Sequence, residues 1–211
     1  MKVAVLLDSN NPFPHRDVGF AKLVAEGSAS GLTGIASAER AITQFATYNS
    51  IYVDLASENM KEAQRDMDEL EKLFTNFCEK QGLRHEWICS HGLAENEWRH
   101  LSPYIDLAIV PPSFSAAKLA TLGVAGMMQL PEKADMPDFT GRCLIAWDGS
   151  PHAARALRAS LPLLPRFKTV DVVMVDPERR EDCFDIGVYL AAHGIAATVI
   201  SEPRGATAFQ M

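Results

Sequence analysis

The chain alternates between short, unbroken apolar runs and longer amphipathic segments. The apolar runs cover residues 3–7, 107–110, 143–147 and 172–175. A strand with one face in water alternates apolar and polar side chains, so unbroken runs predict parallel strands that are covered on both faces. Because helical segments lie between the runs, the pattern predicts an α/β fold with right-handed crossovers.

The longest amphipathic segment predicts a helix that packs on a sheet. Ser57 is expected to cap its start and Gly82 to end it. Its length is short for a coiled coil. Its apolar side chains recur in steps of three and four, which places them on one stripe of the helix: Met60, Ala63, Met67, Leu70, Phe74 and Phe77.

Two more helices are predicted in the last third of the chain. Ser150 followed by Pro151 has the order of a cap and a first helical position, which predicts a helix through about Leu161. A further helix is expected from about residue 180 to His193, ending at Gly194.

The order of these segments repeats. Asp8 ends the first run in "KVAVLLDSN" and Asp148 ends the third in "RCLIAWDGSPHAARAL", an offset of 140 residues (148 − 8). Gly82 and Gly194 end comparable helices at an offset of 112 (194 − 82), so the first copy holds 28 more residues (140 − 112). The sequence therefore predicts a complete unit at residues 1–130, a linker at 131–141, and the first part of a second unit at 142–211.

The second copy stops earlier than the first. It is expected to hold strand, helix, strand, helix and strand, with the rest of the unit missing. Its strand at residues 143–147 would then lie at a sheet edge with apolar side chains on both faces, which invites pairing. We expect Met211 to be the truncation point of a longer protein; the alternative is that another chain covers this edge.

Composition and charge exclude two classes of partner. The chain has 20 Lys and Arg against 27 Asp and Glu, a net charge of −7 without a basic stripe, which excludes nucleic acid as a first expectation. No uncharged apolar run approaches the roughly 18 residues of a membrane span. The four cysteines form no CxxC pair and no targeting segment is evident, so a cytoplasmic location with reduced thiols is expected.

The segment "LIAWDGSPHAARAL" resembles the opening of a unit in tandem universal stress proteins, where an apolar strand is followed by Asp, Gly-Ser and an Ala-rich helix. The likeness extends in pattern over nearly the whole chain and is weaker in motif at residues 2–10. It implies a flavodoxin-like (adenine nucleotide alpha hydrolase-like) α/β fold: a tandem repeat of two parallel-sheet units, each with strand order 3-2-1-4-5.

The resemblance also implies a nucleotide site. In such proteins the acid that ends the first strand approaches the adenine end of bound ATP, and backbone at the end of the second strand meets the base. Mg²⁺ would accompany the nucleotide, and no other metal is expected. The alternative is that each Asp binds no ligand and only forms a turn or caps the next helix. Carried over residue by residue, the site comprises Asp148, Gly149, Ser150 and Val175 in the second unit, and Asp8 and Ile35 in the first.

The phosphate end departs from the family pattern. Nucleotide-binding members have Gly-x-x-Gly, nine residues, and then Gly with Ser or Thr after the fourth strand. Here "PPSFSAAKLATLGVAG" follows that strand, and Pro112, Ser115 and Ala125 occupy the three glycine places. Proline has no N–H to donate, so the first unit is not expected to hold a triphosphate.

Other chemistry has little support. In "RHEWICSHG" the residues His85, Cys89 and His91 share one face of a strand, with His100 nearby, and could bind a metal; a strand that ends in a polar turn explains the same letters. No G-x-S-x-G elbow predicts a nucleophile, so at most slow ATP hydrolysis is expected.

The sequence therefore favours a universal-stress-protein-like protein of the stress response that binds an adenine nucleotide and acts by association, as a homodimer or with another protein. The alternative is a scaffold or dimerisation module that binds no nucleotide.

Overall fold

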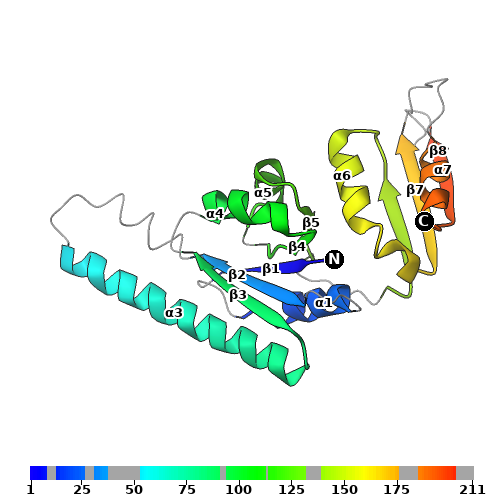
Figure 1. Ribbon diagram of the computed structural model, residues 1–211. Coiled ribbons are helices and arrows are strands. Elements are labelled where there is room, and N and C mark those ends of the chain that lie inside the picture. Colours follow the sequence, from blue (N-terminus) through cyan, green and yellow to red (C-terminus); the bar gives the residue numbers. More distant parts are fainter. Residues whose placement is uncertain are drawn as a thin grey trace. The chain divides into compact units, whose positions relative to one another are not determined.

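A computed structural model describes residues 1–8, 13–26, 31–37, 53–90, 94–112, 114–131, 139–175 and 185–202 of the chain (Figure 1). The chain divides into two compact units, Met1–Met136 and Pro137–Met211. Within the described ranges, no helix is long and apolar enough to cross a membrane.

The first unit contains a five-stranded parallel sheet in the order β3-β2-β1-β4-β5. The predicted α/β fold with a parallel sheet is confirmed. Its strands are β1 (Val3–Asp8), β2 (Leu32–Ser37), β3 (His85–Ser90), β4 (Leu107–Ile109) and β5 (Gly126–Met128).

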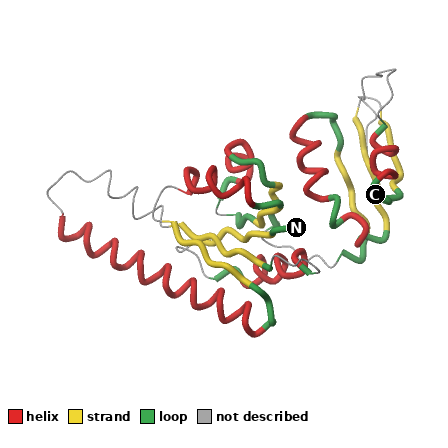
Figure 2. Tube along the Cα trace, viewed as in Figure 1, coloured by secondary structure: helices red, strands yellow, loops and turns green. Residues whose placement is uncertain are grey.

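Helices cover both faces of this sheet, with α1 and α3 on one side and α4 and α5 on the other (Figures 1 and 2). The central strand β1 is therefore buried along its apolar run, as Val3, Val5 and Leu7 are fully buried. The helices are α1 (His15–Ala25), α3 (Val53–Lys80), α4 (Ala94–Leu101) and α5 (Ala116–Leu122), with a 3₁₀ turn η1 (Ser102–Tyr104) after α4.

The long helix α3 packs its apolar stripe on the sheet. Met67, Leu70 and Phe74 are buried as predicted, but the stripe ends at the buried Cys78 instead of Phe77. Steps of three, four and four follow the helical period more closely than a final step of three, which leaves Phe77 at the margin. Burial raises the pKa of the Cys78 thiol to about 11.

The predicted cap of α3 is wrong. The helix begins at Val53, four residues before Ser57, so Ser57 lies inside it. A capping residue must leave the helical backbone conformation, which an interior residue does not do.

The helices α3 and α7 (Ile186–Ala192) end in the same way, each followed by a glycine at positive φ. The φ angle is 63° at Gly82 and 74° at Gly194. The residue after each glycine donates back into the last helical turn, which satisfies carbonyls that the helix leaves unpaired. These bonds run from Leu83 N–H to the Cys78 carbonyl at 2.9 Å and from Ile195 N–H to the Leu190 carbonyl at 3.0 Å. Both glycines end their helices as predicted.

The second unit contains a three-stranded parallel sheet in the order β6-β7-β8. Its buried cluster joins strands and helices on one face of the sheet and includes Leu157, Val172 and Leu190. The predicted start of the last helix at about residue 180 is wrong: Asp185 has an extended backbone and caps the helix, which begins at Ile186. Residues 180–184 lie outside the described residues. The elements are β6 (Arg142–Ala146), α6 (Pro151–Ser160), a 3₁₀ turn η2 (Leu164–Arg166), β7 (Thr169–Val175), α7 and β8 (Ala197–Glu202).

The two sheets share one pairing register. In the first unit Val3 pairs with Leu32, which pairs with His85. In the second unit Cys143 pairs with Val170, which pairs with Ala197. The offsets for the outer members are 140 (143 − 3) and 112 (197 − 85), the same two offsets that the sequence motifs give.

The segment between the units is not polar throughout. Residues 132–138 of the predicted linker lie outside the described residues, whereas Phe139 is 5% exposed and belongs to the second unit. Its ring lies 5.1 Å from the ring of Phe167, and the Arg166 guanidinium stacks over it at 4.3 Å. Phe139 thus anchors the start of the second unit by aromatic and cation–π contact.

A substitution at Gly34 tests how closely β2 packs against the Trp87 and Phe74 side chains. A Cβ at this position would lie 2.7 Å from the Trp87 ring and 3.0 Å from the Phe74 ring. We expect Gly34→Ala to lower the free energy of unfolding by about 1–3 kcal/mol through overpacking, measured by urea denaturation. Gly141→Ala is the matched control, because nothing lies within 4 Å of a Cβ there and its φ is not positive; equal stability of the two variants would contradict this packing.

Candidate functional site

The carboxyl ends of parallel strands gather polar residues at one edge of each sheet, which is where open α/β sheets bind ligands. In the second unit this edge carries Asp148, Gly149 and Ser150 after β6 and Val175 at the end of β7. In the first unit it carries Asp8, Ser37 and the loop that follows β4.

Asp148, Gly149 and Ser150 form a tight turn into α6. The Asp148 carboxylate accepts a hydrogen bond from the Ser150 backbone N–H at 2.8 Å. Gly149 has φ 72°, which only glycine adopts readily. The Ser150 hydroxyl accepts from the Ala153 N–H at 3.1 Å, and Pro151 is the first helical residue, so the predicted cap is confirmed. Asp148 therefore forms the turn that was expected for it in the absence of a ligand.

The electrostatics of this turn favour a charged, accessible acceptor. The Ser150 backbone N–H, followed by the Ser150 side chain, holds the pKa of Asp148 below its ordinary value. Asp148 is exposed, and nothing lies within 4 Å of a Cβ placed on Gly149. The carboxylate has further acceptor capacity, since an ionised carboxyl offers about four lone-pair sites.

Register relates the two halves of the predicted site. Asp8 lies opposite Ser37, and in the second unit the ladder ends with Ala146 opposite Val173. Continued by two residues, this register matches position 148 with Val175. The strand residue that corresponds to Val175 is therefore Ser37. Ile35 lies two residues further inside, opposite Leu6, with 7% exposure in the core. The side chain of Val175 and residues 9–12 after Asp8 lie outside the described residues.

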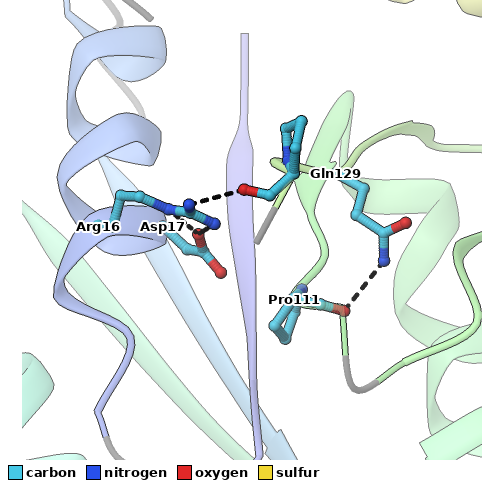
Figure 3. A network of polar contacts seen from close by, with 5 residues as sticks. Arg16, Asp17, Pro111 and Gln129 are labelled. Carbon is cyan, nitrogen blue, oxygen red and sulfur yellow. Dashed lines mark hydrogen bonds and ion pairs between the residues drawn. The ribbon is translucent and has the colours of Figure 1, made fainter. Parts of the chain in front are cut away.

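Hydrogen bonds within the loop after β4 and from Gln129, which follows β5, hold this loop; Figure 3 shows the bond from Gln129 to Pro111. The Phe114 N–H donates to the Pro111 carbonyl at 3.0 Å. Gln129 Nε2 donates to the carbonyls of Pro111 and Phe114 at 3.2 and 3.3 Å. Pro111 and Pro112 have no N–H, and the Phe114 N–H is already used, so these three residues offer no backbone donor to a phosphate. Ser113 lies outside the described residues.

An ion pair that sequence reasoning missed joins the buried Asp17 to the partly exposed Arg16 at the start of α1 (Figure 3). Asp17 is 4% exposed, and its carboxylate lies 3.4 Å from Arg16 Nε. Arg16 also donates to the Pro131 carbonyl at 2.7 Å, across 115 residues of sequence. Burial raises the pKa of Asp17, and the Arg16 charge opposes that rise. This contact fastens α1 to the segment that follows β5.

The weak metal candidates do not form a site among the described residues. The spacing of His85, Trp87 and Cys89 places all three on one face of β3, as predicted. This face packs against α3, where the centroids of the His85 and Phe74 rings lie 6.1 Å apart. Burial raises the pKa of the Cys89 thiol. No three His, Cys, Asp or Glu side chains gather around a metal position in the described ranges, and His91 lies outside them.

Comparison with known proteins relates the fold to one class. No protein-family model matches the chain, and no curated protein does. Ten chains of solved structures match. One is a universal stress protein from Archaeoglobus fulgidus DSM 4304, 14% identical, with a TM-score of 0.64, covering 95% of this chain and 78% of that chain. At this identity the likeness shows the fold alone: the chain has a universal-stress-protein-like α/β fold.

Asp17 and Asp148 should titrate in opposite directions. NMR titration of the side-chain carboxyls is expected to place the pKa of Asp17 above 3.8 and that of Asp148 below it. Stability contributed by Asp148 is present above its unfolded pKa and is lost as pH falls through its folded pKa. Asp17 has the opposite sign, because folding favours its protonated form, so it reduces stability as pH rises from 3.8 through its folded pKa. Two coincident titrations near 3.8 would contradict both environments.

Removing the Arg16 cation tests the ion pair with Asp17. Arg16→Gln should raise the pKa of Asp17 further and lower the free energy of unfolding by about 1–3 kcal/mol at neutral pH, since a buried carboxylate is left without its cation. Urea denaturation measures the loss. The double variant Arg16→Gln with Asp17→Asn removes the stranded charge and should recover part of the stability; no recovery would show that the pair is not energetically coupled.

Proposed function

We propose that this protein is a universal-stress-protein-like protein of the stress response that works by binding and association, and that its adenine-nucleotide site lies in the second unit. Asp148, Gly149, Ser150 and Val175 form this site, and Mg²⁺ accompanies the nucleotide. The single observation that supports the site most is the Asp148 turn: an exposed carboxylate with a depressed pKa, at the end of a parallel strand and at the start of α6.

The chemistry of this turn suits a nucleoside. The Asp148 carboxylate can accept from the amino group of adenine or from a ribose hydroxyl while it keeps its bond to Ser150. The strand β7 continues two residues past Val173, its last residue paired with β6, and backbone there would supply amide donors and acceptors for the base edge. Because glycine holds the turn and leaves open space beside it, a planar ring can approach the backbone there.

The first unit is assigned no nucleotide. Its β4 loop holds two prolines, and Gln129 closes it over the Pro111 and Phe114 carbonyls. Its Asp8 and Ser37 occupy the places that Asp148 and Val175 occupy in the second unit. We propose that this unit serves association, and that hydrolysis is at most slow.

Isothermal titration of the full chain with ATP and with AMP, each with Mg²⁺, tests the site. Asp148→Asn keeps an oxygen for the Ser150 N–H but removes the charge, so binding should weaken about tenfold, which corresponds to about 1.4 kcal/mol. Asp8→Asn is the matched control and should bind as the unmodified chain does. Absence of binding at millimolar ATP and AMP would refute the nucleotide site, and an equal loss in both variants would refute its assignment to the second unit.

A second candidate is a scaffold or dimerisation module without nucleotide. The loop after β4 favours this second candidate. Its two prolines have no N–H to donate to a phosphate, and Gln129 donates to the Pro111 and Phe114 carbonyls. Failure of nucleotide binding, with retained self-association, would favour this candidate.

A further inference from the structure

The strand order of the first sheet places its ligand position between β1 and β4. From β1 the chain adds β2 on one side and later β4 on the other, and every pair is parallel, so all carboxyl ends lie at one edge. Open α/β sheets bind ligands outside this edge, where the strand order reverses. The start of α1, which follows β1, and the loop after β4, which leads to α5, therefore flank the ligand position of the first unit.

The segment after β5 reaches back to this position. Gln129, Leu130 and Pro131 follow β5, which lies on the far side of β4 from β1. Adjacent strands lie about 4.8 Å apart, so β5 lies about 10 Å from β1. The Pro131 carbonyl nevertheless accepts a hydrogen bond at 2.7 Å from Arg16 Nη1, in the first turn of α1. The chain after β5 therefore turns toward the helix that follows β1.

Hydrogen bonds tie this segment to both flanks of the ligand position (Figure 3). Arg16 of α1 holds the Pro131 carbonyl on one side. On the other side Gln129 Nε2 donates to the Pro111 and Phe114 carbonyls, at 3.2 and 3.3 Å, in the loop after β4. The two ties are only two residues apart in the chain, so residues 129–131 bridge the start of α1 and the β4 loop.

The residue between the two ties is buried. Leu130 is 4% exposed, whereas Gln129 and Pro131 on either side of it are exposed. The segment therefore turns an apolar side chain inward and its two neighbours toward solvent. Protein interiors are close-packed, so a ligand cannot enter the volume that a buried leucine fills.

The Arg16 tie is supported from its own helix. The Asp17 carboxylate is 4% exposed as a residue and lies 3.4 Å from Arg16 Nε. A guanidinium carries five N–H donors in one plane, so Arg16 can face this carboxylate and the Pro131 carbonyl together. An ionised carboxyl that is buried without a cation is costly, which favours the conformation in which Arg16 stays beside Asp17.

We propose that residues 129–131 are a strap that closes the ligand position of the first unit, with the Leu130 side chain inside it and Arg16 and Gln129 as its two ties. The proposal rests on the proposed function, which assigns nucleotide binding to the second unit, and deepens it. The prolines of the β4 loop withhold donors from a phosphate, whereas the strap excludes any ligand, including a nucleoside without phosphate.

Thiol protection tests the buried residue of the strap. Leu130→Cys and Pro131→Cys are a matched pair of neighbours, one buried and one exposed. Iodoacetamide should modify the cysteine at position 130 at least about tenfold more slowly, because the strap must open before that thiol can react. Mass spectrometry of the labelled peptides separates these thiols from the native cysteines. Equal rates at the two positions would overturn the proposal.

Untying the strap should remove this protection. Adding Arg16→Gln and Gln129→Ala to Leu130→Cys removes the side-chain donors of both ties and should speed modification about tenfold. Lys22→Gln is the matched control, since Lys22 also lies on α1 but donates to Gln81 Oε1 at 2.8 Å, away from the strap. Unchanged protection in the untied variant, or the same increase with Lys22→Gln, would contradict the assigned ties.

Hydrogen exchange distinguishes local opening from loss of the fold. The Val110 N–H donates to the Met128 carbonyl at 2.8 Å directly before the strap, and the Leu32 N–H donates to the Arg84 carbonyl at 2.9 Å on the other side of the sheet. In the variant with Arg16→Gln and Gln129→Ala, the Val110 amide should exchange faster while the Leu32 amide keeps its rate. Equal acceleration of both amides would show that the ties support the whole unit, and would overturn the strap as a local device.

The strap and the nucleotide site fail separately, because thiol modification and hydrogen exchange require no nucleotide. The untied variant should bind ATP as the unmodified chain does, since the strap belongs to the first unit. A protected thiol at position 130 in a chain that binds no nucleotide would refute the site alone. A reactive thiol there, with nucleotide binding retained, would refute the strap alone.

Discussion

A parallel strand rich in apolar residues must be paired on its edges and covered on both faces, and the structure depends on how each unit meets this requirement. In the first unit β1 pairs with β2 on one side and β4 on the other, while α1 and α3 cover one face and α4 and α5 the other. In the second unit β6 begins with the same register, yet pairs only with β7 among the described residues. Among the described residues, the same strand register is therefore paired on both sides of β1 and on one side of β6.

This difference separates the chemistry of the two units. The strand β4, which pairs with the second side of β1, leads into the proline loop, and Gln129 and the Phe114 N–H donate hydrogen bonds to the carbonyls of that loop. The second unit keeps the Asp148 turn with its glycine and capping serine, and it keeps the exposed apolar side chains of β6 and β8.

Much of the fold could be predicted from local patterns. Apolar runs indicated the strands, steps of three and four indicated the buried stripe of α3, and the two offsets anticipated the shared register of the two sheets. The likeness in fold to a universal stress protein agrees with the resemblance in motif at residues 142–157. Errors arose where a local signal competed with a longer element: Ser57 has the chemistry of a cap but lies inside α3, and Cys78 replaces Phe77 in the core.

The sequence by itself determined the features that depend on a few neighbouring residues: the Ser150 cap, the glycine ends of α3 and α7, and the missing N–H groups of the β4 loop. These follow from backbone conformation and hydrogen bonding within one turn. Only the tertiary structure decided that Arg16 reaches Pro131 across 115 residues, that Asp17 is buried beside it, and that Leu144 faces outward. Packing between distant segments sets these, because burial depends on which surfaces meet and not on the residues that adjoin in the chain.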